Sequence, residues 1–210
     1  MRAHLYLVCD ARSDAFLQAA LRGGVDIIQL RMKDAGDERI VAAGRRFRSA
    51  CAAHDALFIL NDRPDLVEAT EADGVHVGQH DTPIARAREL VGPERIVGLS
   101  THTPEQIDAA AGGACDYIGV GPVYETPTKP GRPPVGVGLV RYAASHAGLP
   151  FFAIGGVGLS NVAAIHEAGA IRAAVVRALT EASDPEPVAR ELRAGVAGKR
   201  ADREVRVGPA

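Results

Sequence analysis

The sequence predicts a single (β/α)8 TIM barrel, an α/β fold in which parallel strands and helices alternate. Eight apolar segments alternate with segments of helical periodicity, and several consecutive strand starts lie 21 or 22 residues apart. A weak internal repeat agrees with this, because Gly or Ala and an Asp precede the strands in segments 24–27, 72–75 and 113–117. A chain of 210 residues can bury the core of one such domain.

The expected strands start near residues 5, 27, 58, 75, 96, 117, 151 and 173. The expected helices span residues 13–22, 37–53, 83–91, 105–111, 161–168 and 185–196. Ser13, Thr82, Thr103 and Ser160 are residue types that cap helix N-termini, and proline follows Thr82 and Thr103 at the first helical position. Prolines and glycines exclude a helix or central strand from residues 125–137, so we expect a long functional loop there.

Domain organisation follows from the same pattern. We expect residues 1–197 to form the barrel catalytic domain, with no linker inside it. The charged segment 198–210 lacks periodicity and is expected to be a disordered C-terminal tail.

The composition argues against several classes of protein. A formal net charge of −2 gives no global basic field, so we predict no nucleic-acid or membrane partner. Cys9, Cys51 and Cys115 match neither a disulfide framework nor a zinc site and are expected to be buried free thiols. No apolar run reaches the roughly 20 residues of a membrane span, and the N-terminal run is too short for a signal peptide. We therefore expect a cytoplasmic protein.

Polar residues alternate at the end of the second expected strand, at Gln29, Arg31 and Lys33. Alternate side chains of a strand share one face, so these three would point to the barrel axis, and Leu30 and Met32 to the helix layer. Two converging cations favour an anion site over the alternative, in which the strand ends at Leu30 and the cations are solvated.

Aspartates follow the third and fourth strands, which are neighbours in a barrel. Asp62 and Asp81 could both reach one Mg²⁺, which takes one or two carboxylates and completes its shell with water and phosphate oxygens. Each could instead cap a helix, entered at Pro64 or Pro83. Taken together beside the cations and Asn61, they favour a magnesium–diphosphate site.

A second phosphate site is predicted by the glycine-rich segment 155–158 after the seventh strand, where barrels often bind phosphate. Arg177 follows the eighth strand, where the other half of such a site belongs. His76, His80 and His102 could be acid–base groups, but a core or surface role is the safer interpretation of each.

Taken in order, these motifs resemble the thiamine-phosphate synthase family. That family carries Gln-x-Arg-x-Lys, Asn-Asp, Gly-x-His-x-Gly-Gln-x-Asp, Ser-x-His, Gly-Pro-x-x-x-Thr-x-Thr-Lys and Gly-Gly, and the chain has each in this order from Gln29 to Gly156. The resemblance spans Leu5 to about Leu192. It implies a transferase of thiamine biosynthesis that joins hydroxymethylpyrimidine diphosphate to thiazole ethyl phosphate, or its carboxylated form, releasing diphosphate. Diphosphate would leave first, and the thiazole nitrogen would then capture a pyrimidine methyl cation.

The resemblance also implies roles for individual residues. The ligands of the pyrimidine diphosphate would be Gln29, Arg31, Lys33, Asn61, Ser100 and Lys129. Among them Lys129, Arg31 and Ser100 would be catalytic. Mg²⁺ would be held by Asp62 and Asp81. The thiazole phosphate would be held by Thr126, Thr128, Gly156, Val176 and Arg177. The family usually has serine where this chain has Arg177, which would either bind the phosphate or form a surface salt bridge; His80 has no assigned role.

Three alternatives stay open at this stage. A thiazole tautomerase of the same pathway would have a histidine after the glycine of the sixth strand, where this chain has Gly121-Pro122. A sugar-phosphate epimerase would show ligands for its own chemistry. A non-catalytic phosphate-binding barrel would bind both substrates without turnover. Phosphorylated small molecules are the expected partners in each case. Two pairs of alternatives accompany them: a single chain or a homo-oligomer, and a thiazole with or without a carboxylate.

Overall fold

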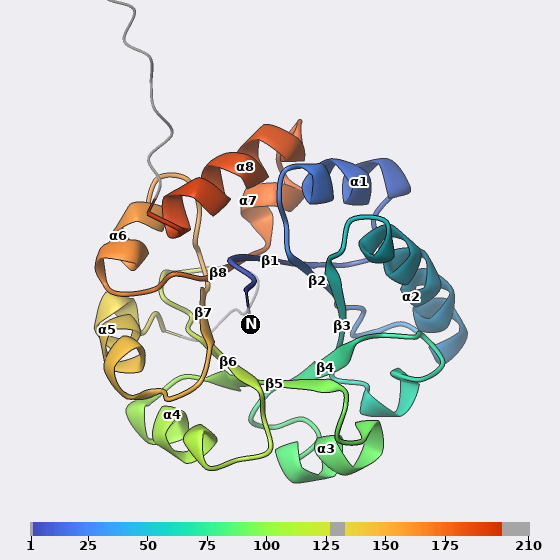
Figure 1. The fold of residues 1–210 in the computed structure, drawn as a ribbon, viewed down its shortest axis with the longest axis horizontal. Coiled ribbons are helices and arrows are strands. Elements are labelled where there is room, and N and C mark those ends of the chain that lie inside the picture. The colour runs from blue at the N-terminus through green and yellow to red at the C-terminus, as the bar shows by residue number, and fades with distance from the viewer. Residues whose placement is uncertain (1, 127–132, 199–210) are drawn as a thin grey trace, which may run out of the picture.

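Eight parallel strands close into a barrel, and helices surround it (Figure 1), as the sequence predicts. The computed structural model describes residues 2–126 and 133–198. The strands are paired in chain order, with β8 closing against β1. They are β1 Leu5–Cys9, β2 Ile27–Leu30, β3 Leu57–Asn61, β4 Gly74–Val77, β5 Ile96–Thr101, β6 Tyr117–Val120, β7 Phe151–Ile154 and β8 Ala173–Val175.

The helices lie on the outside of the barrel, between successive strands or after the last strand (Figure 1). They are α1 Asp14–Arg22, α2 Asp37–Ala52, α3 Ile84–Val91, α4 Pro104–Ala111, α5 Gly136–His146, α6 Val162–Glu167, α7 Arg177–Thr180 and α8 Pro185–Val196, with a 3-10 helix at Pro64–Leu66. Ser13 and Thr103 cap α1 and α4, as predicted, by accepting from Phe16 N and Gln106 N. The expected caps Thr82 and Ser160 are wrong, because Pro83 and Asn161 occupy those N-cap positions without a side-chain cap bond.

One further expectation needs correction. Helix α5 begins at Gly136, inside the segment 125–137 expected to be irregular. No helix was expected at α5 or α7, and the four residues of α7 are too few to show a periodicity. Residues 199–210, the greater part of the expected tail, lie outside the described residues, and the predicted domain boundary stays a prediction.

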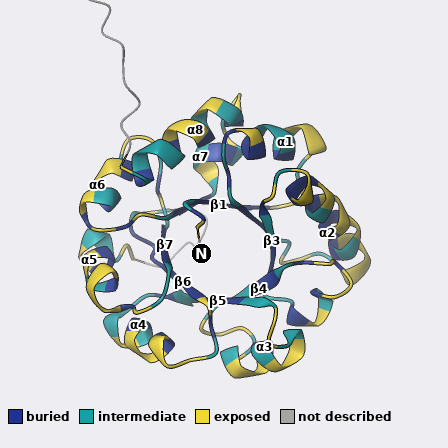
Figure 2. Cartoon of the chain, in the orientation of Figure 1, coloured by how far each residue is buried: buried dark blue, intermediate teal, exposed yellow. Residues whose placement is uncertain are grey.

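Strand alternation divides the core into two layers. Leu5, Leu7 and Cys9 of β1 pack against the helices, whereas Tyr6 and Val8 belong to a second cluster that fills the barrel interior. Figure 2 shows the result, with buried strands inside and helices whose outer faces are exposed. This apolar layer fills the barrel interior, and polar groups occupy the end of the barrel at which the strands have their carboxyl ends.

The repeated aspartates have a structural role at the start of the strands. Asp26 accepts from the backbone of Leu5 at 3.0 Å, Asp73 from Phe58 N at 2.8 Å, and Asp116 from Val97 N at 2.7 Å. Each also pairs with an arginine of the helix layer, and these arginines are Arg193, Arg48 and Arg88. Each aspartate therefore satisfies an N–H at the start of the preceding strand and ties the barrel to a helix.

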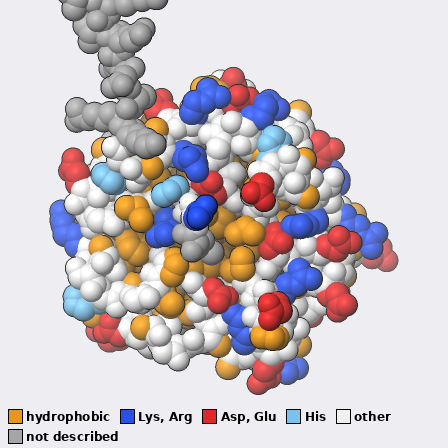
Figure 3. All heavy atoms as spheres, viewed as in Figure 1, with side chains coloured by type: hydrophobic (Ala, Val, Ile, Leu, Met, Phe, Trp, Pro, Cys, Tyr) orange, Lys and Arg blue, Asp and Glu red, His pale blue; other side chains and the backbone are white. Residues whose placement is uncertain are grey.

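The surface and the thiols agree with the composition. On the face shown in Figure 3, basic and acidic side chains are mixed. Cys9, Cys51 and Cys115 are buried free thiols, as predicted. Within the described residues, no helix combines the length and the apolar character that crossing a membrane requires.

Candidate active site

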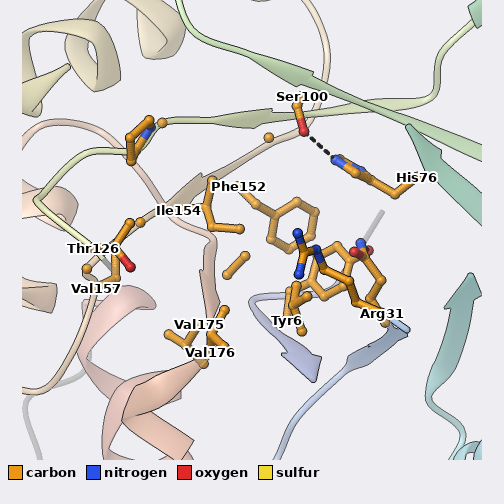
Figure 4. Close-up of a pocket in the computed structure, with 18 of the residues that line it drawn as sticks. Tyr6, Arg31, His76, Ser100, Thr126, Phe152, Ile154, Val157, Val175 and Val176 are labelled. Atoms are coloured by element: carbon orange, nitrogen blue, oxygen red, sulfur yellow. Dashed lines mark hydrogen bonds between the residues drawn. The ribbon is translucent and has the colours of Figure 1, made fainter. Parts of the chain in front are cut away.

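A cavity of about 410 Å³ lies at the carboxyl ends of the strands, and every strand or the loop after it contributes to its lining. It brings together eleven predicted site residues: Gln29, Arg31, Lys33, Asn61, Asp62, Asp81, Ser100, Thr126, Gly156, Val176 and Arg177. The other two, Thr128 and Lys129, lie outside the described residues. Figure 4 places Arg31 on one side of the cavity and Thr126, Val157, Val175 and Val176 on the other.

Strand β2 and the residues after it supply the first wall of the cavity. The strand itself ends at Leu30, as the alternative interpretation had it, but its side-chain alternation continues to Lys33. Gln29 is buried, and its amide donates to the Tyr6 hydroxyl at 2.6 Å, while Arg31 and Lys33 line the cavity beyond it. Leu30 belongs to the helix-side core and Met32 packs against it. The predicted division of this strand between the barrel axis and the helix layer is confirmed.

Asp62 and Asp81 meet at the mouth of the cavity, although they come from different strand ends. Lys33 Nζ lies 3.4 Å from Asp62 Oδ2, and Asp81 Oδ2 accepts from Gly78 N at 2.9 Å. Burial, and then the neighbouring Asp81 carboxylate, raise the pKa of Asp62 above its usual range. The alternative that they cap helices is wrong, because neither the 3-10 helix nor α3 has a side-chain cap bond.

This carboxylate pair fits a hard divalent cation. Two neighbouring carboxylates repel each other, and a bound cation would cancel this repulsion. Oxygen is also the ligand atom that Mg²⁺ prefers. No cluster of three or more His, Cys, Asp or Glu side chains suited to a metal occurs among the described residues. The protein therefore offers two carboxylates, and the rest of a Mg²⁺ shell would come from water and ligand oxygens.

The opposite wall consists of the glycine turn after β7 and the start of α7. Gly156 has φ +64°, and a Cβ there would lie 2.7 Å from the carbonyl oxygen of Glu125, so glycine lets the two loops approach. Arg177 is the first residue of α7, lines the cavity, and contacts Glu181 through Nε–Oε1 at 2.6 Å. Glu181 lines the same cavity, so a phosphate there would compete with it for the guanidinium.

Sequence reasoning missed the floor of the cavity. Tyr6, Tyr117 and Phe152 pack edge to face, with ring centroids 5.2–6.0 Å apart, and His76 lies beside Tyr117. The sequence Val75-His76-Val77 contained a signal for His76, because a polar residue between two apolar ones in a strand faces the other way. The two valines pack on the helix side, and His76 therefore faces the barrel axis. His102 also lines the cavity, whereas His80 is exposed.

Residues 5–179 match the family model described as thiamine monophosphate synthase. The chain belongs to this family. It is 48% identical to the thiamine-phosphate synthase of Saccharopolyspora erythraea over 204 residues, which covers 91% of this chain and 92% of that protein. It is 47% identical to the thiamine-phosphate synthase of Nostoc sp. over 193 residues, 91% of this chain but 55% of that protein. The chain thus spans about half the length of the Nostoc relative.

Solved structures of this family share its barrel. The thiamine phosphate pyrophosphorylase of Pyrococcus furiosus superposes with a TM-score of 0.84 and 31% sequence identity, covering 92% of this chain and 95% of that one. The resemblance inferred from the motifs between Gln29 and Gly156 is therefore confirmed at the level of family and fold.

Proposed function

We propose that the chain is a thiamine-phosphate synthase, a transferase that joins hydroxymethylpyrimidine diphosphate to thiazole ethyl phosphate and releases diphosphate. The observation that carries the proposal is that groups able to bind an anion line two opposed walls of the same cavity. Arg31 and Lys33 supply cationic side chains on one wall, and the glycine turn and Arg177 supply donors on the other. A reaction between two phosphorylated molecules needs both.

On the first wall, Arg31, Lys33 and Asn61 would bind the diphosphate, with Ser100 and Gln29 nearer the floor. Asp62 and Asp81 would hold Mg²⁺, which when bound supplies positive charge to the diphosphate oxygens. Lys129 is assigned to the same diphosphate from its sequence motif. On the second wall, Thr126, Gly156, Val176 and Arg177 would hold the thiazole phosphate. Thr128 is assigned to the same phosphate from its sequence motif.

The residues of the cavity suit a dissociative displacement. Cleavage of the carbon–oxygen bond moves an electron pair onto the departing diphosphate, and Arg31 and Lys33 stabilise the charge that develops there. The aromatic floor of Tyr6, Tyr117 and Phe152 can hold a flat heterocycle. The two walls would then set the thiazole nitrogen against the cationic carbon. No step requires a strong base.

The proposal is tested by supplying each substrate alone and both together with Mg²⁺. We expect diphosphate release and thiamine phosphate only when both are present. A change in the thiazole phosphate alone, without the pyrimidine, would instead support the tautomerase alternative, and binding of both without product would support a non-catalytic barrel. A cytoplasmic location stays a prediction.

A further inference from the structure

A continuous chain of hydrogen bonds crosses the barrel beneath the cavity. Gln29 Nε2 donates to the Tyr6 hydroxyl at 2.6 Å, and the Tyr6 and Tyr117 hydroxyls are 2.9 Å apart. The Tyr117 hydroxyl lies 3.0 Å from His76 Nδ1, and His76 Nε2 lies 2.9 Å from Ser100 Oγ. The chain runs from β2 through β1, β6 and β4 to β5, and ends at a residue that faces the cavity; Figure 4 shows its last link.

The surrounding residues are arranged to keep this chain in place. Tyr6 and Tyr117 are 2% and 0% exposed. Gly98 pairs with Tyr117 across β5 and β6, and a Cβ at Gly98 would lie 2.2 Å from Tyr117 Cζ, so only glycine lets the ring lie across β5. The backbone carbonyl of Ser100 accepts from Gln79 Nε2 at 2.7 Å, which anchors the far end.

The proton order of the chain is fixed from the Gln29 end. Since an amide hydrogen of Gln29 already points at the Tyr6 oxygen, the Tyr6 hydrogen is directed to Tyr117. The opposite order would leave a buried hydroxyl hydrogen unpaired, which is unfavourable. Tyr117 then donates to His76 Nδ1. Burial raises the pKa of both tyrosines, so their hydroxyls keep these hydrogens near neutral pH.

We infer that His76 is a positioning residue, held by Tyr117 as the Nε2–H tautomer, and that it makes Ser100 a hydrogen-bond donor to the bound ligand. Nε2–H occupies an acceptor position of Ser100 Oγ, so the serine hydrogen is presented to an acceptor atom in the cavity. This inference rests on the proposed function for the identity of that ligand, the pyrimidine diphosphate. The tautomer itself is independent of the ligand.

A double-mutant cycle on turnover tests the link between Tyr117 and Ser100. Ser100→Ala should lower kcat/KM about 10- to 100-fold, the loss expected for one hydrogen bond to a charged group. Tyr117→Phe, which keeps the ring, should lower it about 3- to 10-fold in the parent and leave it unchanged in the Ser100→Ala background. Equal losses in both backgrounds would overturn the inference, because Tyr117 would then act independently of Ser100.

A matched control is Tyr142→Phe, which removes a tyrosine hydroxyl bonded to Asp108 and lies outside the cavity lining. It should leave kcat/KM unchanged.

Nitrogen-15 NMR of the histidine rings tests the tautomer without any turnover. At about pH 8, above the ordinary histidine pKa, the ring signals that disappear in His76→Gln or His76→Asn should belong to an Nε2–H tautomer. In Tyr117→Phe they should shift toward a mixture of tautomers. An Nδ1–H or doubly protonated ring in the parent would overturn the inference. This result stands even if the parent makes no thiamine phosphate, so failure of the proposed function is distinguished from failure of the inference.

Discussion

Arg177 stands where the resemblance to the family led us to expect a serine. Its guanidinium contacts Glu181 at 2.6 Å and is half exposed, yet both side chains line the cavity. The sequence left two roles for Arg177, phosphate ligand and surface ion pair. The geometry allows the ion pair in the absence of a phosphate and a phosphate contact in its presence. A phosphate would have to displace Glu181.

Titration of the thiazole phosphate against Arg177 variants separates these roles. Arg177→Ala should weaken binding of the thiazole phosphate about 10-fold. This is the lower end of the range for a charge-assisted hydrogen bond, because solvent screens an exposed side chain. Arg177→Ser should be milder and Arg177→Glu worse, while Glu181→Gln should strengthen binding about 2- to 5-fold by releasing the guanidinium. The affinity for the pyrimidine diphosphate is the internal control. Unchanged thiazole-phosphate affinity in Arg177→Ala would leave only the ion pair.

Asp62 and Asp81 are expected to lower the stability of the metal-free protein, because two neighbouring carboxylates repel each other when both are ionised. A raised pKa means that the protonated form of Asp62 is favoured in the folded state, so stability from this group is present at low pH and is lost as pH rises through the folded pKa. Near neutral pH the ionised pair therefore opposes folding, unless a cation binds.

Asp81→Asn should relieve this repulsion and keep the bond from Gly78 N, which an amide oxygen can also accept. In chelator, its Tm should equal or exceed that of the parent. Adding Mg²⁺ with diphosphate should raise the Tm of the parent by several degrees and leave the variant unchanged, and the variant should lose most activity. Equal Mg²⁺ shifts in both proteins would contradict the metal assignment.

At the scale of elements, the strands are tied to the helix layer by partly exposed Asp–Arg pairs at their starts. Asp73 accepts from Phe58 N at 2.8 Å and from Arg48 Nη1 at 2.7 Å. Asp73→Ala should lower the free energy of unfolding by about 1–3 kcal/mol, because it leaves a backbone N–H of β3 without its acceptor. Urea unfolding measures this.

The control is Asp65→Ala, which removes an exposed carboxylate paired with Arg63 at 2.6 Å. A surface pair contributes about 0–1 kcal/mol. Equal losses in the two variants would mean that the strand contact of Asp73 adds nothing.

The sequence predicted the elements better than it predicted the floor of the site. Observed strand starts at Leu57 and Gly74 differ by one residue from expectation, because apolar runs mark a buried strand directly. Gln29, Arg31 and Lys33 were placed correctly because alternation fixes which side chains share a face. The Tyr6–Tyr117 contact joins residues 111 positions apart, and only closure of the barrel brings them together.

At the scale of the whole molecule, the buried thiols report on global unfolding. Burial raises the pKa of Cys51 to about 12 and also raises that of Cys9 and Cys115. Their contribution to stability is present below the ordinary thiol pKa of about 8.5 and is lost as pH rises toward the folded values. At about pH 8 a thiol reagent should react slowly with the native protein and rapidly with all three cysteines in denaturant. Rapid reaction of the native protein would contradict this burial.

The molecule as a whole places Arg31 and Lys33 across one cavity from the glycine turn and Arg177, and the central claim is that two phosphorylated substrates are joined there. The most direct measurement is product stoichiometry, with mass spectrometry for the organic product and a phosphate assay for diphosphate. With both substrates and Mg²⁺, we predict thiamine phosphate and diphosphate in equal amounts, and neither product when one substrate is omitted. Diphosphate released without the thiazole, or no thiamine phosphate from the intact chain, would contradict the claim.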